Sequence, residues 1–160
     1  MNLIPFELGP IRPPAEADSL LIRTTRGCPW NRCHFCTLFK GMQFSIRPVD
    51  DILADVTAAR HYYGETPFET CFLQDGDAFA MRTPDLVTVL EALRSAFPSL
   101  KRISSYGRAQ TLLRKSAADL AAIHGAGLNM LYCGIESGSD PVLARVNKGV
   151  TQAEILQSTL

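Results

Sequence analysis

Residues 19–36 read SLLIRTTRGCPWNRCHFC, a short apolar run followed at once by three closely spaced cysteines. The run at 19–25 combines apolar and β-branched residues, which predicts a buried strand. Cys28, Cys33 and Cys36 follow it with the spacing C-x4-C-x2-C. Because the functional loops of parallel α/β folds come directly after strands, this stretch predicts both a fold class and the place of a site.

Beyond this stretch, apolar runs alternate with amphipathic segments along the chain. Further strands are expected at 69–74, 101–105 and 129–135. Helices are expected at 48–63, from Thr83, from Ser116 to the stop signals Gly125 and Gly127, at 140–146, and from Thr151. Strands that alternate with helices predict βαβ units and a parallel sheet.

The number of βα units limits which fold the chain can form. Four βα units are too few to close the usual barrel of eight, which takes about 250 residues, whereas this chain has 160. We therefore expect an open parallel α/β sheet of βα units, curved like part of a (β/α) barrel and incomplete at its C-terminal end. Residues 1–18 contain a proline-rich stretch and predict an extended N-terminal arm, while residues 19–160 predict one core domain.

Polar residues follow each of the expected strands. The carboxyl ends of parallel strands meet at one edge of a sheet, so these residues are expected to converge on one rim. They are the cysteines after the first strand, Asp75, Gly76 and Asp77 after the second, Ser104 and Ser105 at the end of the third, and Glu136 after the fourth. This convergence indicates an active site more strongly than any one motif does.

The composition excludes several classes of protein. With 46% hydrophobic and 20% charged residues, the chain is of the ordinary globular class. Lys plus Arg and Asp plus Glu both number 16, which argues against a strong nucleic-acid surface, although a basic excess in residues 1–47 leaves RNA contact as a weaker hypothesis. No apolar run approaches the ~20 residues of a membrane helix. Five cysteines, three of them clustered, favour a reducing cytoplasmic compartment over a disulfide framework.

Three thiols in one loop admit more than one kind of metal chemistry. A structural zinc site needs four ligands, usually as two separated pairs, and no second pair follows in this chain. His34 stands between two candidate ligands and is poorly placed to bind the same ion with them. A [4Fe–4S] cluster binds thiolates readily, and three thiolates leave one iron with an exchangeable position. A zinc or iron–sulfur binding module therefore remains as an alternative to a catalytic cluster.

Two motifs resemble those of a known enzyme family. The stretch RGCPWNRCHFC at 26–36 resembles the cluster loop of the radical S-adenosylmethionine (SAM) enzymes, which also follows a first strand. The stretch GIESGSDPVLARVNKG at 134–149 is similar to the segment after the fourth strand in the branch of the tRNA methylthiotransferases, the Elongator-type catalytic subunit and the oxygen-independent coproporphyrinogen oxidase. The likeness extends from about Leu20 to the C-terminus. The common spacing in this family is C-x3-C-x2-C, so this chain has one additional residue between Cys28 and Cys33.

The resemblance implies a role for each residue that matches a family motif. Cys28, Cys33 and Cys36 would ligate three irons of a [4Fe–4S] cluster, and SAM would bind the fourth iron. The remaining roles concern SAM. Phe35 would pack against the cluster and the adenine, Glu136 would accept hydrogen bonds from the ribose, and the segment Asp75, Gly76 and Asp77 would receive the methionine ammonium. Lys148 would face the carboxylate of SAM, with Ser104 and Ser105 as weaker candidates.

The same resemblance implies the reaction. A one-electron reductant of the flavodoxin or ferredoxin type would reduce the cluster, and the 5′-deoxyadenosyl radical from SAM would take a hydrogen atom from a substrate that the sequence does not identify. One alternative is a binding module without SAM chemistry, and another is a catalytically incomplete N-terminal fragment with an uncovered sheet edge. Cys133 is expected to be a small buried residue and Arg108 a solvated loop residue.

Overall fold

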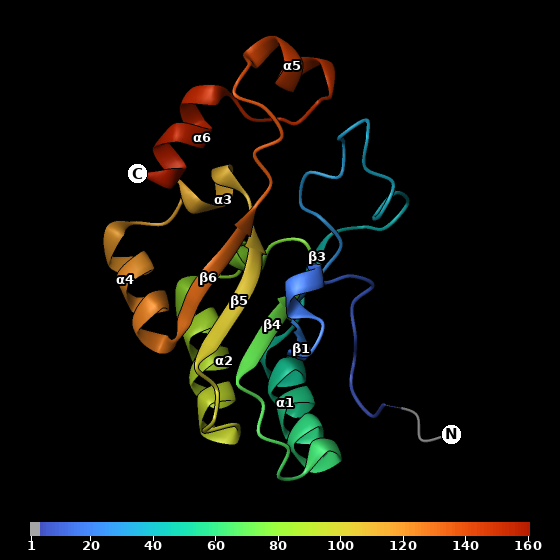
Figure 1. The fold of residues 1–160 in the computed structure, drawn as a ribbon, viewed down its shortest axis with the longest axis vertical. Coiled ribbons are helices and arrows are strands. Elements are labelled where there is room, and N and C mark those ends of the chain that lie inside the picture. Colours follow the sequence, from blue (N-terminus) through green and yellow to red (C-terminus); the bar gives the residue numbers. More distant parts are fainter. Residues whose placement is uncertain (1–3) are drawn as a thin grey trace.

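The fold is built on one parallel sheet, described for residues 4–160 in a computed structural model. The strand order is β1-β4-β5-β6, with each neighbouring pair parallel (Figure 1). The strands are β1 (Leu20–Arg23), β4 (Thr70–Gln74), β5 (Arg102–Gly107) and β6 (Leu128–Cys133). Neighbours in space are thus neighbours in chain order, as repeated βα units dictate. Residues 1–3 of the predicted arm lie outside the described residues.

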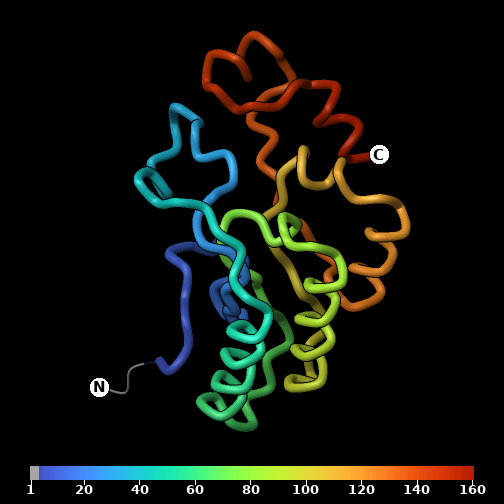
Figure 2. Tube along the Cα trace, turned by 180° about the vertical axis from the view of Figure 1, so that it is seen from behind, coloured from blue at the N-terminus to red at the C-terminus, as the bar shows by residue number. Residues whose placement is uncertain are grey.

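Helices that connect the strands pack their apolar side chains against the sheet. They are α1 (Val49–Tyr63), α2 (Thr83–Ala96) and α4 (Ala117–Ala126). Figure 2, which views the molecule from behind, shows α1 and α2 in front of the strands. Ile52, Leu86 and Ile123 of these helices join Ile22 and Leu73 of the sheet in one buried core. Within residues 4–160, no helix has the length and apolar character needed to cross a membrane.

The N-terminal segment packs on the core instead of standing apart from it. The one-turn helix η1 (Pro14–Glu16) lies in front of the sheet in Figure 1. Glu16 is fully buried there, and its carboxylate accepts hydrogen bonds from Ser104 (2.8 Å) and Tyr132 (2.7 Å). Phe6 packs against the aromatic rings at the end of α1. The described part of the arm therefore covers sheet surface that the helices leave open.

The strand predicted at 19–25 is divided into two. After β1, strand β2 (Thr25–Arg26) leaves the sheet and pairs antiparallel with β3 (Ser45–Ile46). β2 leads into the loop that carries the cysteines, and β3 leads out of it. The two-residue pair closes the base of this loop, which we call the cysteine loop (residues 27–44). Strand β3 is too short to leave a periodic signal in the sequence, and its partner is almost twenty residues away.

Three short helices stand with the cysteine loop above the carboxyl edge of the sheet (Figure 1). They are α3 (Ala109–Leu112), α5 (Asp140–Arg145) and α6 (Gln152–Thr159). Ala109, Leu143, Val150 and Ile155 form a second, smaller apolar cluster among them. Strand β5 runs two residues beyond the predicted end at 105 and reaches Gly107. This extension places Ser104 inside the strand and not at its end.

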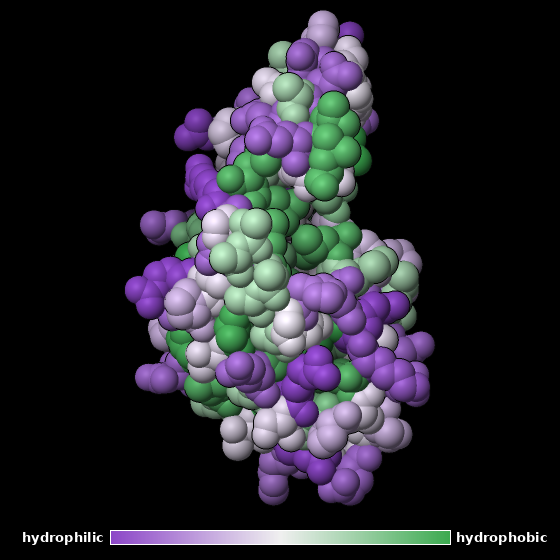
Figure 3. Space-filling model, turned by 90° about the vertical axis from the view of Figure 1, so that its left-hand side faces the viewer, coloured by the Kyte–Doolittle hydropathy of each residue, from purple (hydrophilic) through white to green (hydrophobic). Residues whose placement is uncertain are grey.

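Strand β6 is an edge of the sheet within the described residues. Figure 3 shows the side of the molecule that carries this edge, with apolar side chains running through the middle of the face. The last third of the chain includes several large apolar side chains that are 40–57% exposed: Met130, Ile135, Val142 and Leu156. An unpaired edge strand presents free backbone groups to which a further strand can pair.

Candidate active site

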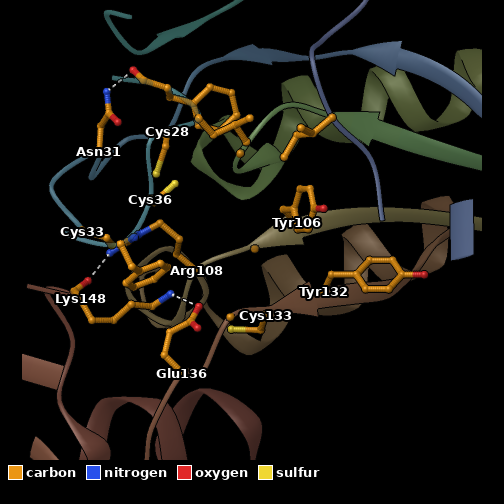
Figure 4. A pocket seen from close by; sticks show the side chains of 17 residues that line it. Cys28, Asn31, Cys33, Cys36, Tyr106, Arg108, Tyr132, Cys133, Glu136 and Lys148 are labelled. Atoms are coloured by element: carbon orange, nitrogen blue, oxygen red, sulfur yellow. Dashed lines mark hydrogen bonds and ion pairs between the residues drawn. The ribbon is translucent and has the colours of Figure 1, made fainter. Parts of the chain in front are cut away.

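A cavity of about 450 Å³ opens at the carboxyl edge of the sheet. Its walls come from the cysteine loop, from the loops after β4, β5 and β6, and from the N-terminal segment (Figure 4). Seven of the ten predicted site residues line this cavity: Cys28, Cys33, Phe35, Cys36, Gly76, Glu136 and Lys148. The cavity therefore brings together residues from both of the motifs that the sequence analysis singled out.

Three thiols of the cysteine loop line the cavity. Cys33 is buried, Cys28 and Cys36 are half-buried, and all three are free thiols. Figure 4 shows the Cys28 and Cys36 side chains pointing toward the same space, with Glu136 and Lys148 below them in this view. Within residues 4–160, no three His, Cys, Asp or Glu side chains are grouped as ligands of one metal ion. The thiols are thus spread around a cavity and are not gathered at a single point.

The root of the cysteine loop is held by the turn after β4. The Gly27 N–H donates to Asp75 Oδ2 (2.9 Å), and the Gly76 N–H donates to the Gly27 carbonyl (3.1 Å). Glycine is required at position 76, because a Cβ there would lie 2.8 Å from the Gly27 oxygen and 3.2 Å from Cys28 Cα. The two hydrogen bonds fix the backbone next to Cys28, the first thiol of the loop.

Asp75 is fully buried and forms an ion pair with Arg23, whose Nη2 lies 2.5 Å from Asp75 Oδ2. Glu7 extends the network through ion pairs with Arg23 (2.8 Å), Arg26 (2.6 Å) and Arg47 (3.2 Å). The hydrogen bond from Arg26 lowers the pKa of Glu7 below its ordinary value. A buried charge requires such partners. The Asp75 carboxylate is therefore engaged inside the protein and does not line the cavity.

The Asp77 carboxylate also points into the protein. It accepts hydrogen bonds from the Phe79 N–H (3.1 Å) and from the Thr111 hydroxyl (2.6 Å). Burial raises the pKa of Asp77 to about 6, although the hydrogen bond from Thr111 opposes the increase. Like that of Asp75, the Asp77 carboxylate does not line the cavity. Of the three residues of the turn, Gly76 lines the cavity.

The raised pKa of Asp77 predicts a pH dependence of stability. An acid with a higher pKa in the folded chain favours folding while it is protonated, and this contribution is lost as the pH rises from about 4 to about 6. The variant Asp77→Asn has no acid at this position and does not lose this contribution. The free energy of unfolding of Asp77→Asn minus that of wild type is therefore expected to grow by about 2 kcal/mol as the pH rises over the same range. Urea denaturation of both proteins at several pH values measures the difference. Glu7 and Glu16, whose pKa values are lowered, are common to both proteins and cancel. Parallel pH profiles would contradict the prediction.

Ser104 lies outside the cavity, in the interior of the sheet. Its hydroxyl donates to Glu16 Oε1 (2.8 Å). Burial disfavours the charge of Glu16, but hydrogen bonds from Ser19, Tyr132, Ser104 and Arg102 together lower its pKa. Ser105 is also buried and donates to backbone carbonyls. Both hydroxyls therefore bond to partners inside the fold and do not line the cavity.

Glu136 and Lys148 form an ion pair on the wall of the cavity. Lys148 Nζ donates to Glu136 Oε1 at 3.0 Å and lies 6.0 Å from the centroid of the Phe35 ring. The absent side chain of Gly134 leaves room for this pair, because a Cβ there would lie 2.7 Å from Glu136 Oε1 and 3.0 Å from Lys148 Nζ. Phe35 is 53% exposed and lines the cavity.

Several residues that line the cavity were not predicted as site residues. Arg108 and Cys133 both line it, although the first was expected to be solvated and the second to be an ordinary buried residue. Burial raises the pKa of Cys133, which favours its neutral thiol form. Tyr106 and Tyr132 lie at paired positions of β5 and β6, with ring centroids 6.2 Å apart. All of these residues stand at or near strand ends, and both ends were mispredicted: β5 ends at Gly107, two residues after its predicted end, and β6 ends at Cys133, two residues before its predicted end.

Comparison with known protein families identifies the family of this chain. Residues 22–159 match the model of the radical SAM superfamily. The chain belongs to this superfamily. The family predicted from the two motifs and the fold class predicted from the alternation of strands and helices are therefore confirmed, whereas the narrower assignment to the tRNA methylthiotransferase branch stays a prediction.

The radical SAM chain also resembles particular proteins. It is 26% identical over 142 residues to an uncharacterized methyltransferase of Pyrococcus horikoshii, covering 86% of this chain and 28% of that protein. The cobalamin-dependent S-adenosylmethionine radical enzyme OxsB, with aqua-cobalamin and S-adenosylmethionine bound, has a TM-score of 0.63 at 18% identity, over 88% of this chain and 21% of OxsB. Apo OxsB has a TM-score of 0.65 at 17% identity over the same shares. The structural likeness shows a common fold, and the chain spans less than a third of each relative.

The donor set of this radical SAM chain fits the cofactors that its family uses, a [4Fe–4S] cluster and SAM. Thiolates are the usual ligands of such a cluster, and three thiols of one loop line one cavity here. The same cavity holds a carboxylate and an ammonium, Glu136 and Lys148, which are suited to the hydroxyl and carboxylate groups of SAM.

Proposed function

We propose that this chain is the core of a radical SAM enzyme in which Cys28, Cys33 and Cys36 hold the cluster. The observation that supports the proposal is that these three free thiols line the same cavity as Glu136 and Lys148. When bound, the cluster supplies the electron that cleaves SAM to methionine and a 5′-deoxyadenosyl radical, which takes a hydrogen atom from the substrate. The chain's own residues bind and orient the cofactors.

The proposed SAM contacts are residues that line the cavity. Lys148 pairs with the SAM carboxylate, Glu136 accepts hydrogen bonds from the ribose hydroxyls, and Phe35 covers the cluster and the adenine. The ammonium contact is assigned to the backbone carbonyl of Gly76, because the carboxylates on either side of it are engaged inside the protein. Lys148 and Glu136 would exchange their mutual contact for contacts with SAM.

The variant Glu136→Gln is expected to weaken the binding of SAM by roughly tenfold, because a hydrogen bond to a charged acceptor contributes about 1.5–3 kcal/mol. The affinity is measured by isothermal titration of the reconstituted chain with SAM under anaerobic conditions. Glu69→Gln is a matched control, because Glu69 forms an exposed ion pair with Lys101 (2.6 Å) outside the cavity. Wild-type SAM affinity in Glu136→Gln would contradict the assigned ribose contact.

The remaining parts of the proposal concern the surroundings of this core. We assign residues 19–160 to the catalytic core and residues 4–18 to a segment packed on it. The reductant is of the flavodoxin or ferredoxin type, and the compartment is the cytoplasm, in keeping with the free thiols.

The name of the Pyrococcus horikoshii relative makes methyl transfer the first reaction class to assay. RNA substrates of the methylthiotransferase branch are the second.

The decisive experiment is anaerobic reconstitution with iron and sulfide, followed by incubation with SAM and dithionite. The expected result is a [4Fe–4S] spectrum and the formation of 5′-deoxyadenosine. A chain that holds a full cluster and forms no 5′-deoxyadenosine would overturn the SAM-cleaving function and favour a simple iron–sulfur module. A chain that holds one zinc ion and no cluster would favour the zinc alternative.

A further inference from the structure

The cysteine loop is fastened to the turn that follows α5. Four hydrogen bonds among the described residues cross between these segments, which are 111 to 117 residues apart in the sequence. They run from the Trp30 indole N–H to the Asn147 carbonyl (2.8 Å), from the His34 N–H to the Val146 carbonyl (2.9 Å), from His34 Nδ1 to the Arg145 carbonyl (3.0 Å) and from the Asn147 side-chain amide to the Arg32 carbonyl (3.0 Å). Two loops from distant βα units are thereby joined above the sheet.

Trp30 packs its ring directly onto Gly149. A Cβ built on Gly149 would lie 2.7 Å from Trp30 Cη2 and nearer still to Cε2 and Cζ2, so no other residue type fits against the ring. The guanidinium groups of Arg32 and Arg108 lie 5.3 and 5.7 Å from the ring centroid, within the range of a cation–π contact. The indole is therefore held by a hydrogen bond, by close packing and by two cations.

The contacts between the cysteine loop and the turn after α5 lie on both sides of one residue from each of the two motifs. Cys33 lies between Arg32 and His34, which both hydrogen-bond to the turn after α5. Lys148 lies between Asn147 and Gly149, which both contact Trp30. The backbone on both sides of each site residue is thus constrained. A displacement of the indole would change the position of Cys33 relative to Lys148.

We propose that Trp30 is a positioning residue, which fastens the cysteine loop to the turn at 146–149 and so holds Cys33 in place relative to Lys148. In its reference to the cofactors, this inference rests on the proposed function. It also gives a physical reason for the additional residue between Cys28 and Cys33. The four-residue spacer contains Trp30, and its length allows the ring to reach Gly149 while both thiols still line the cavity.

Trp30 is the single tryptophan of the chain, so its fluorescence reports on the junction with or without cofactors. Gly149→Ala is expected to displace the ring, shift its emission to longer wavelength and raise its quenching by acrylamide toward that of free tryptophan. Gly149→Ala also removes the indole hydrogen bond and the packing of the ring. The reconstituted variant is therefore expected to lose iron to a chelator roughly ten times faster than the wild-type chain. Trp30→Phe, which keeps a ring but lacks the N–H, is expected to increase this rate by a smaller factor.

The matched control is Gly64→Ala. Gly64 also has a positive φ (58°, against 71° for Gly149), but a Cβ there would meet nothing within 4 Å. Gly64→Ala therefore also places an alanine at a positive φ, but without the collision, and is expected to keep the wild-type emission, quenching and rate of iron loss. Wild-type quenching in Gly149→Ala would overturn the fastening, and wild-type iron loss in both Gly149→Ala and Trp30→Phe would overturn the positioning role. If the wild-type chain bound no cluster, the proposed function would fail, while the fluorescence comparison would still decide whether Trp30 fastens the loop.

Discussion

Cys33→Ser is expected to abolish cluster assembly and, with it, the formation of 5′-deoxyadenosine from SAM. Cys33 is 7% exposed and lines the cavity from within the cysteine loop. A thiolate is the ligand that an iron–sulfur cluster takes, whereas a serine hydroxyl of nearly the same size stays protonated at neutral pH. The iron and sulfide content after anaerobic reconstitution, together with the visible absorption of the cluster, measures this loss.

Cys133 provides the matched control for this substitution. Its thiol lines the same cavity but lies at the end of β6 and not in the cysteine loop. Cys133→Ser is therefore expected to keep the iron content of the wild-type chain. A loss of iron as complete as in Cys33→Ser would place Cys133 in the ligand set, and a full cluster in Cys33→Ser would contradict the proposed ligands.

Asp75→Ala is expected to lower the free energy of unfolding by ~3 kcal/mol, because removal of one of its two partners leaves a buried charge only partly compensated. The charge concerned is the Arg23 guanidinium, whose side chain is 11% exposed and which would keep Glu7 as its remaining partner. The Gly27 N–H would also lose its acceptor at the root of the cysteine loop. Urea denaturation of the metal-free chain measures the loss without any contribution from cofactors.

The control for Asp75→Ala is an ion pair of similar length on the surface. Glu65 lies 2.7 Å from Arg60, and its side chain is 95% exposed. Glu65→Ala is expected to change the free energy of unfolding by less than about 1 kcal/mol, as exposed ion pairs do. Asp75→Asn keeps an acceptor for the Gly27 N–H and is expected to fall between the two. An Asp75→Ala variant as stable as Glu65→Ala would contradict the structural role given to Asp75.

Predictions from the sequence were accurate where the signal lies within one segment. The cap at Ser116 and the stop at Gly127 mark the ends of α4, which begins after the first and ends before the second. The cysteine loop was placed correctly because the strand before it and the thiols within it are contiguous. The ends of β1 and β5 were wrong by a few residues, and these errors hid the pair of β2 with β3 and put Ser104 at the rim.

Side-chain partners from distant segments could not be predicted in this way. Asp75 follows a strand end, as a cavity residue would, but Arg23 and Gly27 draw its carboxylate inward from about fifty residues away. Ser104 was expected to contact the cofactor, but its hydroxyl donates a hydrogen bond to Glu16, which lies 88 residues earlier in the sequence. Neither partner leaves a local pattern that periodicity or spacing can detect.

By itself, the sequence determined the order of the βα units, the three thiols of the cysteine loop and the membership of the radical SAM superfamily. These features depend on contiguous residues, whose spacing sets the strand, the helix and the loop before any long-range contact forms. Only the tertiary structure decided which polar groups face the cavity and that Trp30 of the spacer after Cys28 packs on Gly149. The physical reason is that a buried carboxylate, hydroxyl or indole points toward the partner that best compensates for its lost hydration, and in this chain those partners are far away in the sequence.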